Sequence, residues 1–271
     1  MKLAISNIAW SVEREPEVAA LLQRLGVAAV EVAPSKVAAD PLAATRADLL
    51  AYRRFWERHG IQIVAMQSLL FGVPGMALFQ DQASRDRMQQ YLQKLIEFGS
   101  ILGAETLVFG SPRNRQRGDM PLEQAIQIAT PFFRELGRTA NDLGIWFCLE
   151  PNPVQTGCDF LTRSDEALEF VRAVDQPGFG LHLDTGGIWQ SQDPLSVCTA
   201  AGSCWRHLHL SEPDLVPFGT GGVDHAPIAA AVRASGYDRW MSLEMKTIPE
   251  DCCLSVIEQA VALARQLYGS A

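Results

Sequence analysis

Short apolar runs and stretches of helical periodicity alternate along the whole chain. Runs rich in Val, Ile, Leu and Phe are typical of parallel strands that are buried on both faces. Eight such strands are predicted: Leu3–Ile8, Val27–Ala33, Ile61–Met66, Thr106–Phe109, Ile145–Leu149, Phe179–Leu183, Trp205–Leu210 and Trp240–Leu243. Between them, apolar residues recur every three or four positions, as in residues 88–102 and 254–268, which indicates amphipathic helices.

Glycine marks several points where a helical stretch gives way to a strand. These glycines are Gly26, Gly60, Gly103, Gly144 and Gly236. Glycine after a helix takes the left-handed conformation without a Cβ penalty, so it ends the helix and turns the chain. Eight strand–helix units in 271 residues predict a single-domain (β/α)8 TIM barrel over residues 1–271. An open dinucleotide-binding sheet would need a G-x-G-x-x-G turn after its first strand, and residues 6–10 contain none.

Composition and charge narrow the classes of protein that such a barrel can belong to. Hydrophobic residues make up 48% and charged residues 20%, as in globular proteins. The net charge of −8 disfavours binding to nucleic acid or to an anionic membrane, because phosphate affinity rests on a basic surface. We expect no transmembrane segment and no signal peptide, because long apolar stretches are missing. The six cysteines form no C-x-x-C pair, which favours free thiols in a reducing compartment and a cytoplasmic protein.

Side chains that can bind a metal ion stand at the ends of four successive predicted strands. Glu150, Asp184 and Glu244 follow the fifth, sixth and eighth strands, and His209 lies near the end of the seventh. In TIM barrels the carboxyl ends of the strands meet at one mouth, so we expect these four side chains to converge. Three carboxylates around one imidazole would repel one another without a counter-ion. Their oxygen and nitrogen donors suit one divalent ion, Mn²⁺, Mg²⁺, Co²⁺ or Zn²⁺, whereas the alternative is a set of salt-bridged rim residues.

Other polar residues near the strand ends are candidates for substrate binding. Glu31 and Gln67 belong to the second and third strand ends, and Lys246 follows Glu244. Arg113 and Arg115 follow the fourth strand, where they could bind a phosphate or carboxylate group. The alternatives are a solvated surface loop for the arginines and pairing with the carboxylates for Lys246.

The sequence resembles a known family at the four metal-binding candidates. It is similar to the sugar isomerase/epimerase branch of the xylose-isomerase-like TIM barrels, which includes tagatose epimerases, hydroxypyruvate isomerases and inosose dehydratases. The resemblance is carried by Glu150 in LEPNP, Asp184 in HLDTGG, His209 in HLHLSEP and Glu244 in SLEMK. The segments LLFG at 69–72 and VFGSPRNR at 108–115 resemble a subgroup of sugar phosphate isomerases/epimerases. The resemblance implies that the four residues are metal ligands and that Glu150 and Glu244 are also the acid/base pair.

The chain departs from the family epimerases around the substrate. Gly187 stands where they have a His three residues after the Asp. Residues 155–157 replace a second Glu, and residues 214–216 replace an Arg that holds the sugar. The metal site therefore transfers from the family, whereas the substrate site does not.

Several further side chains near the predicted mouth admit two interpretations. Trp10, Phe71 and Trp189 follow the first, third and sixth strands, where an aromatic ring could pack on the apolar face of a sugar or simply fill the rim. His182 and His207 lie one layer below the metal-binding candidates, and we expect hydrogen-bonded histidines of the barrel interior there.

These features predict a metal-dependent isomerase or epimerase of carbohydrate metabolism. The small-molecule substrate would be a sugar, sugar phosphate or sugar acid, and proton transfer would pass through a metal-stabilised enediolate. A lyase, either a dehydratase or a 3-keto-glycoside eliminase, could use the same site. An enzyme like the DNA-repair endonuclease IV is disfavoured by only five histidines, and a non-catalytic ligand-binding barrel by the intact set of four ligands. The identity of the sugar and the formation of a homo-oligomer stay open.

Overall fold

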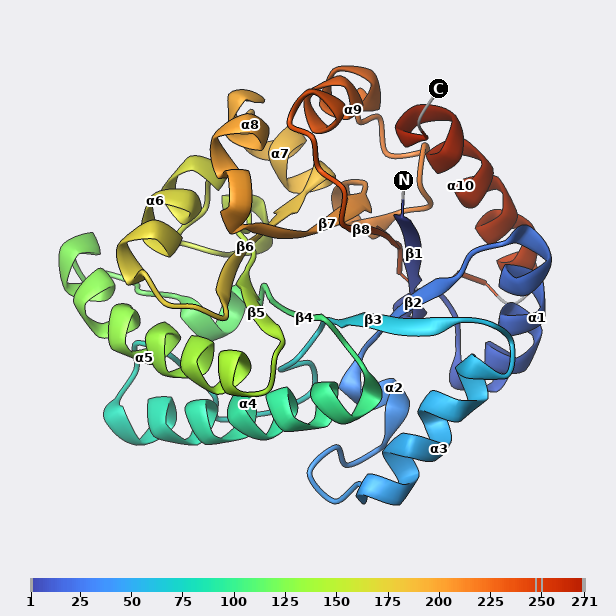
Figure 1. Ribbon diagram of the computed structural model, residues 1–271. Helices are drawn as coiled ribbons and strands as arrows, with labels where there is room; N and C mark the ends of the chain where they lie inside the picture. The colour runs from blue at the N-terminus through green and yellow to red at the C-terminus, as the bar shows by residue number, and fades with distance from the viewer. Residues whose placement is uncertain (1, 247, 250, 270–271) are drawn as a thin grey trace.

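Eight parallel strands close into a barrel, and helices surround it on the outside (Figure 1). The computed structural model describes residues 2–246, 248–249 and 251–269. Each strand pairs with the next along the chain, and the last pairs with the first. The strands are β1 Lys2–Ser6, β2 Ala29–Val32, β3 Gln62–Met66, β4 Thr106–Phe109, β5 Trp146–Leu149, β6 Phe179–Asp184, β7 Trp205–Ser211 and β8 Trp240–Glu244. The predicted (β/α)8 TIM barrel and all eight of its strands are confirmed.

Each long helix buries the apolar stripe that its sequence carries. In α4, Met88, Leu92 and Leu95 are buried along one side, as the periodicity of this segment predicts. Helix α1 ends at Gly26, whose φ of 64° is left-handed, so the predicted glycine cap is present. The α-helices are α1 Glu15–Leu25, α2 Pro34–Val37, α3 Arg46–Glu57, α4 Gln82–Leu102, α5 Leu122–Asp142, α6 Ser164–Val174, α7 Thr185–Ser191, α8 Ser196–Ala201, α9 His225–Ala234 and α10 Cys253–Tyr268. In the described part of the chain, no helix has the length and apolar character needed to cross a bilayer.

The barrel interior is layered, with small apolar residues below and polar residues above. Ala4, Ala29 and Val64 form a small buried cluster that is separate from the main core between the strands and the helices. Residues two apart on a strand point to the same face, so Glu31 lies one layer above Ala29. The pairing of β6 with β7 sets Asp184 beside His209, and the pairing of β7 with β8 sets Ser211 beside Glu244. This register places the polar layer at the carboxyl ends of the strands.

Candidate metal centre

Four side chains from four successive strands converge at the carboxyl end of the barrel. Glu150 directly follows β5, Asp184 ends β6, His209 belongs to β7 and Glu244 ends β8. One potential ligand atom from each lies within 4.8 Å of those of the other three. Nδ1 of His209 is 3.2 Å from Oε2 of Glu244 and 3.8 Å from Oε1 of Glu150. The structure thus brings together the four residues that the sequence predicts as metal ligands.

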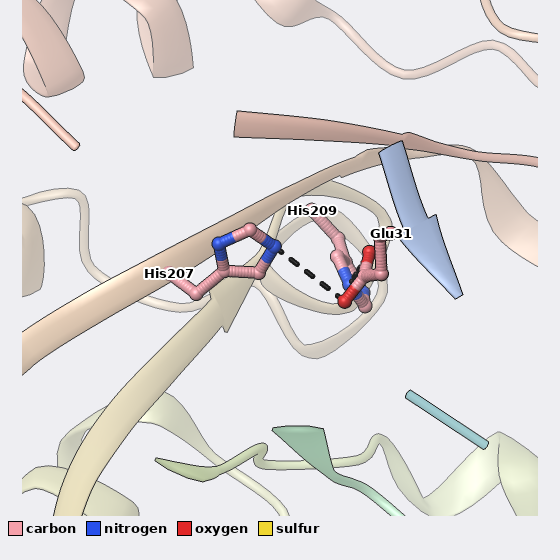
Figure 2. A group of neighbouring side chains, drawn as sticks. All are labelled: Glu31, His207 and His209. Carbon is pink, nitrogen blue, oxygen red and sulfur yellow. Dashed lines mark hydrogen bonds and ion pairs between the residues drawn. The ribbon is translucent and has the colours of Figure 1, made fainter. Parts of the chain in front are cut away.

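Glu31 determines which nitrogen of His209 faces these carboxylates. Figure 2 shows the Glu31 carboxylate next to the rings of His207 and His209, and its Oε2 lies 2.9 Å from Nε2 of His209. Since Nε2 donates to this buried carboxylate, a neutral His209 ring has its lone pair on Nδ1. Among the described residues, Nδ1 has no hydrogen-bond partner. The lone pair on Nδ1 and the nearby carboxylate oxygens repel one another unless a positive charge lies between them. This nitrogen and these oxygens are therefore suitable ligands for a divalent cation.

The electrostatics of the cluster favour a positive charge at its centre. Burial raises the pKa of Asp184 to about 7, and the nearby Glu150 and Glu244 add to this shift. Burial also raises the pKa of Glu244. Burial alone would lower the pKa of His209, but Glu31 and Glu244 raise it well above its ordinary value. The carboxylates therefore favour a positive charge at His209, which a proton can supply. A divalent ion in place of that proton would supply the same charge and would also keep the carboxylates ionised.

Glu31 itself is a fully buried carboxylate between two imidazoles. Burial opposes its ionisation, but His209 and His207 outweigh that effect and hold the pKa of Glu31 well below its usual range. His207 lies 3.5 Å from Oε1 of Glu31 and 3.0 Å from Oγ of Ser242 through its Nε2. His207 is therefore the hydrogen-bonded interior histidine that the sequence predicts. Glu31 lies between His207 and His209 and fixes the orientation of the His209 ring.

His182 departs from the expectation of a hydrogen-bonded ring. It is fully buried, and neither of its ring nitrogens has a hydrogen-bond partner among the described residues. Burial lowers its pKa well below the usual value, and His209 and His207 add to the effect, so the ring is neutral. Its Nε2 is 3.8 Å from Oε1 of Glu150, which places it directly below the candidate metal ligands.

Asp184 is held in place by its neighbours. Oγ of Ser211 donates to its Oδ2 at 2.5 Å, and the backbone N–H of Gly187 donates to its Oδ1 at 2.5 Å. Ser211 was missed as a site residue, although it stands two positions after His209 on the same face of β7. Gly110 was missed as well. A Cβ at position 110 would collide with Oε2 of Glu150, so the glycine after β4 leaves room for this carboxylate.

A cavity of about 340 Å³ opens above the four converging side chains. We call it the central cavity. Gln67 and Lys246, which the sequence predicts to bind substrate, line this cavity, and Lys246 is the only cationic side chain among the described residues of its wall. Further residues of the wall are Ser68, Gly110, Ser111, Pro112, Glu150, Asn152, Gln155, Asp184, Gly186, Gly187, Gln190, Ser211, Glu212 and Glu244. Its volume lies at the lower end of the range for small-molecule sites, about 300–1,000 Å³.

Three residues predicted to bind substrate do not line the central cavity. Glu31 lies beneath His209, as described above. Arg115 is 0% exposed, and its guanidinium donates to the carbonyl oxygens of Phe160 at 3.0 Å and of Glu150 at 2.6 Å. Because these contacts are internal, Arg115 supports the backbone at Glu150, and the expectation that it reaches a ligand is corrected.

Arg113 lies on the other side of the loop, in a neighbouring cavity of about 460 Å³. We call this the arginine-side cavity. It meets the central cavity along Ser68, Ser111 and Pro112, and Phe71 also lines it. Arg113 is thus close to the mouth but outside the central cavity.

The fold and the site define a TIM barrel with a candidate metal centre at the carboxyl ends of β5 to β8. A model of the family described as "Xylose isomerase-like TIM barrel" matches residues 19–265, and the chain belongs to this family. A ketose 3-epimerase of Arthrobacter globiformis is 32% identical over 101 residues, which span 36% of this chain and 34% of that protein. The match thus covers about a third of this curated relative.

Solved structures share the whole fold at low sequence identity. A D-psicose 3-epimerase in the presence of D-fructose has a TM-score of 0.81 at 18% identity and covers 100% of both chains. The D-psicose 3-epimerase of Clostridium cellulolyticum H10 with D-tagatose has a TM-score of 0.82 at 17% identity, again over 100% of both chains. A 3-keto-D-glucoside 4-epimerase from E. coli has a TM-score of 0.78 at 13% identity, over 97% of this chain and 99% of that chain.

Proposed function

We propose that the protein is an isomerase or epimerase that moves a proton at a carbon next to the carbonyl group of a sugar or sugar derivative. One observation carries this proposal: Glu150 and Glu244, from non-adjacent strands, approach the same ring nitrogen of His209 at the floor of one cavity. The names of the epimerases that share the family and the fold support the same reaction class.

We propose one divalent cation as cofactor, Mn²⁺, Mg²⁺, Co²⁺ or Zn²⁺, held by Glu150, Asp184, His209 and Glu244. Their ligand atoms lie close enough together for this role. When bound, such an ion polarises the substrate carbonyl and stabilises the negative charge that develops on its oxygen. Of the three carboxylates, Asp184 is assigned to ion binding alone, because hydrogen bonds from Ser211 and Gly187 already fix its position.

Glu150 and Glu244 divide the proton transfer between them. One carboxylate removes the proton from carbon, and the other returns a proton from its own side of the cavity. Return to the opposite face of the same carbon inverts it, and return to the neighbouring carbon isomerises the sugar. Gln67, Asn152 and Gln190 present amides to the cavity, and amides suit the hydroxyl groups of a carbohydrate.

A lyase is the second candidate, and Gly187 favours it. The residue at this position of the cavity wall has no side chain, so the imidazole expected in the family epimerases is missing there. A substrate that loses a β-hydroxyl or alkoxyl group after the same proton removal would be dehydrated or cleaved. Nucleic acid is disfavoured as substrate, because a single lysine faces several carboxylates in the central cavity.

The experiment follows deuterium by NMR in D2O with added Mn²⁺. Ketoses, keto acids, 3-keto-glycosides and their phosphates form the substrate panel. We expect deuterium to enter the carbon next to the carbonyl. An isomer or epimer as product supports the first candidate, and an unsaturated or dehydrated product supports the lyase.

Glu244→Gln is the decisive variant, because glutamine keeps an oxygen donor but cannot accept the proton. We expect it to abolish the formation of an isomer, epimer or elimination product. The control is Glu258→Gln on the exposed side of α10, which should form product like the wild type. Product formation that survives in Glu244→Gln, or cleavage of abasic DNA by the wild type, would contradict the proposal.

A further inference from the structure

The central cavity meets a second, larger cavity on the side of α7. This second cavity has a volume of about 620 Å³, and we call it the tryptophan-side cavity because Trp189 lines it. It shares Gln155 and Gln190 with the wall of the central cavity. Helix α7 contributes residues to the walls of both cavities. Gly186 and Gly187 line the central cavity, and Trp189 lines the tryptophan-side cavity.

Two glycines follow Thr185 in α7, so positions 186 and 187 present no side chain to the central cavity. A Cβ on Gly186 would lie 2.7 Å from Oγ of Ser211, and one on Gly187 would lie 3.2 Å from Oδ1 of Asp184. The only side chains common to both walls are those of Gln155 and Gln190 among the described residues. Both are flexible amides, so a ligand that fills the central cavity has a route past them.

The walls of the tryptophan-side cavity have the chemistry that recognises an uncharged sugar ring. Trp189 is 44% exposed and offers an aromatic face, with Leu195 and Pro227 as further apolar wall residues. Gln192 and Asp224 add polar groups that can bind hydroxyls. No lysine or arginine occurs among the described residues of this wall, so nothing there would bind a phosphate or carboxylate.

The arginine-side cavity, on the opposite side of the mouth, has a different character. Its exposed aromatic residue is Phe71, which is 76% exposed, but Arg113 lines the same cavity. A cationic wall suits an anionic substituent better than a neutral ring. The two sides of the mouth can therefore be told apart by the charge of the group that they bind.

We propose that the substrate is a carbonyl-bearing glycoside of two rings. The reacting ring occupies the central cavity between Glu150 and Glu244. The second, uncharged sugar ring passes over Gly187 and packs on Trp189 in the tryptophan-side cavity. This inference rests on the proposed function and narrows its substrate class.

Binding to the Mn²⁺-loaded protein tests the proposal by calorimetry, independently of turnover. The one-ring probe is D-fructose, and the two-ring probes are turanose and isomaltulose, in each of which a glucosyl ring is joined to fructose. We expect the wild type to bind at least one two-ring probe about tenfold more tightly than D-fructose. Trp189→Ala should remove this preference.

Phe71→Ala is the matched control, because it truncates an exposed aromatic residue on the opposite side of the mouth. It should keep the preference for two rings. Circular dichroism and thermal unfolding check that all variants are folded. The proposal is overturned if neither two-ring probe binds more tightly than D-fructose, if Trp189→Ala keeps the preference, or if Phe71→Ala removes it.

The outcomes separate this proposal from the proposed function. If two-ring probes bind through Trp189 but no member of the substrate panel exchanges deuterium, the binding site stands and the reaction class fails. If deuterium exchange occurs on one-ring sugars while the two-ring preference is absent, the reaction class stands and the glycoside proposal fails.

Discussion

The two halves of the barrel contribute different chemistry to its mouth. Strands β5 to β8 end in Glu150, Asp184, His209 and Glu244, which converge below the central cavity. In the other half, Glu31 of β2 is fully buried beneath His209 and does not line the central cavity. One half thus carries the proposed ion ligands and acid/base groups, whereas the other half contributes a carboxylate that contacts the imidazole of His209. The carboxylates differ in what they face: Glu244 lines the central cavity, whereas Glu31 lies against Nε2 of His209.

The largest effect is expected from His209→Ala, which removes a ligand of the reactive half. The site would keep its three carboxylates but would lose its nitrogen ligand, so the divalent ion would bind more weakly. We expect protein purified without chelator to lose its bound divalent ion, measured by elemental analysis, and to lose deuterium exchange. His59→Ala, a histidine next to Phe55 at the end of α3, should retain both. An unchanged metal content in His209→Ala would show that the two halves do not differ in this way.

Glu31→Gln tests the supporting half and should act on affinity alone. Glutamine has nearly the same shape but lacks the negative charge that accepts from Nε2 of His209 and lies 3.5 Å from Nε2 of His207. Loss of such a partner lowers metal affinity by about 10–100-fold. Titration of the metal-free protein with Mn²⁺ measures this change, and ¹⁵N NMR of the His209 ring reports its tautomer. Gln67→Ala, which also alters the β1–β4 half but leaves His209 untouched, should bind Mn²⁺ like the wild type. Equal Mn²⁺ affinities for Glu31→Gln and wild type would rule out the positioning role.

Arg115→Met probes the loop where the two halves join, and its effect should appear in stability. The substitution removes the guanidinium donor from the carbonyl oxygens of Phe160 and Glu150, and the weakly donating Sγ of Cys158 is then left as a donor to Phe160. An unsatisfied buried acceptor costs about 1–3 kcal/mol, so we expect the free energy of unfolding to fall by about 2–4 kcal/mol. Urea unfolding followed by circular dichroism measures it. A loss below about 0.5 kcal/mol would show that these contacts do not hold the loop.

Arg113→Ala should have the smallest effect, although it lies only two positions away. Surface substitutions change stability by about 0.5 kcal/mol or less. Arg113 lines the arginine-side cavity, so we expect a raised KM only for substrates with an anionic substituent, and an unchanged KM for neutral ones. Steady-state kinetics on matched neutral and phosphorylated substrates distinguish the two. A raised KM for neutral substrates would place Arg113 in the central site after all.

The fold was predictable because buried parallel strands are apolar over their whole length, and such runs are visible without tertiary information. The predicted ends were less accurate. The run Val27–Ala33 shortens to Ala29–Val32. At its start the N–H of Val27 still bonds to the carbonyl oxygen of Leu22 and closes the preceding helix, and at its end Ala33 is the N-cap of α2. The pattern of apolar residues does not show where such backbone hydrogen bonds form, so it does not predict the exact ends of a strand.

The four converging residues were predictable because position at a strand end determines their place in a barrel. The roles of Glu31 and Arg115 were not, because their partners are distant in sequence. Glu31 bonds to His209, 178 positions away, and Arg115 bonds to Phe160, 45 positions away. Only the register of the closed barrel decides whether such a side chain turns inward or toward the mouth.

The position of Glu244 on β8 links the site to the order in which the barrel assembles. β8 pairs with β1, so Ile5 lies beside Leu243, and this contact joins the most distant strands in the chain. Such long-range pairing is slow to form, because the entropy of loop closure opposes it. A chain in which β8 has not docked has no Glu244 carboxylate beside His209. An ion held by this cluster would therefore stabilise the closed barrel relative to intermediates in which β8 is undocked. It would slow unfolding but would leave the refolding rate unchanged, because the ion can bind only after the last strand docks.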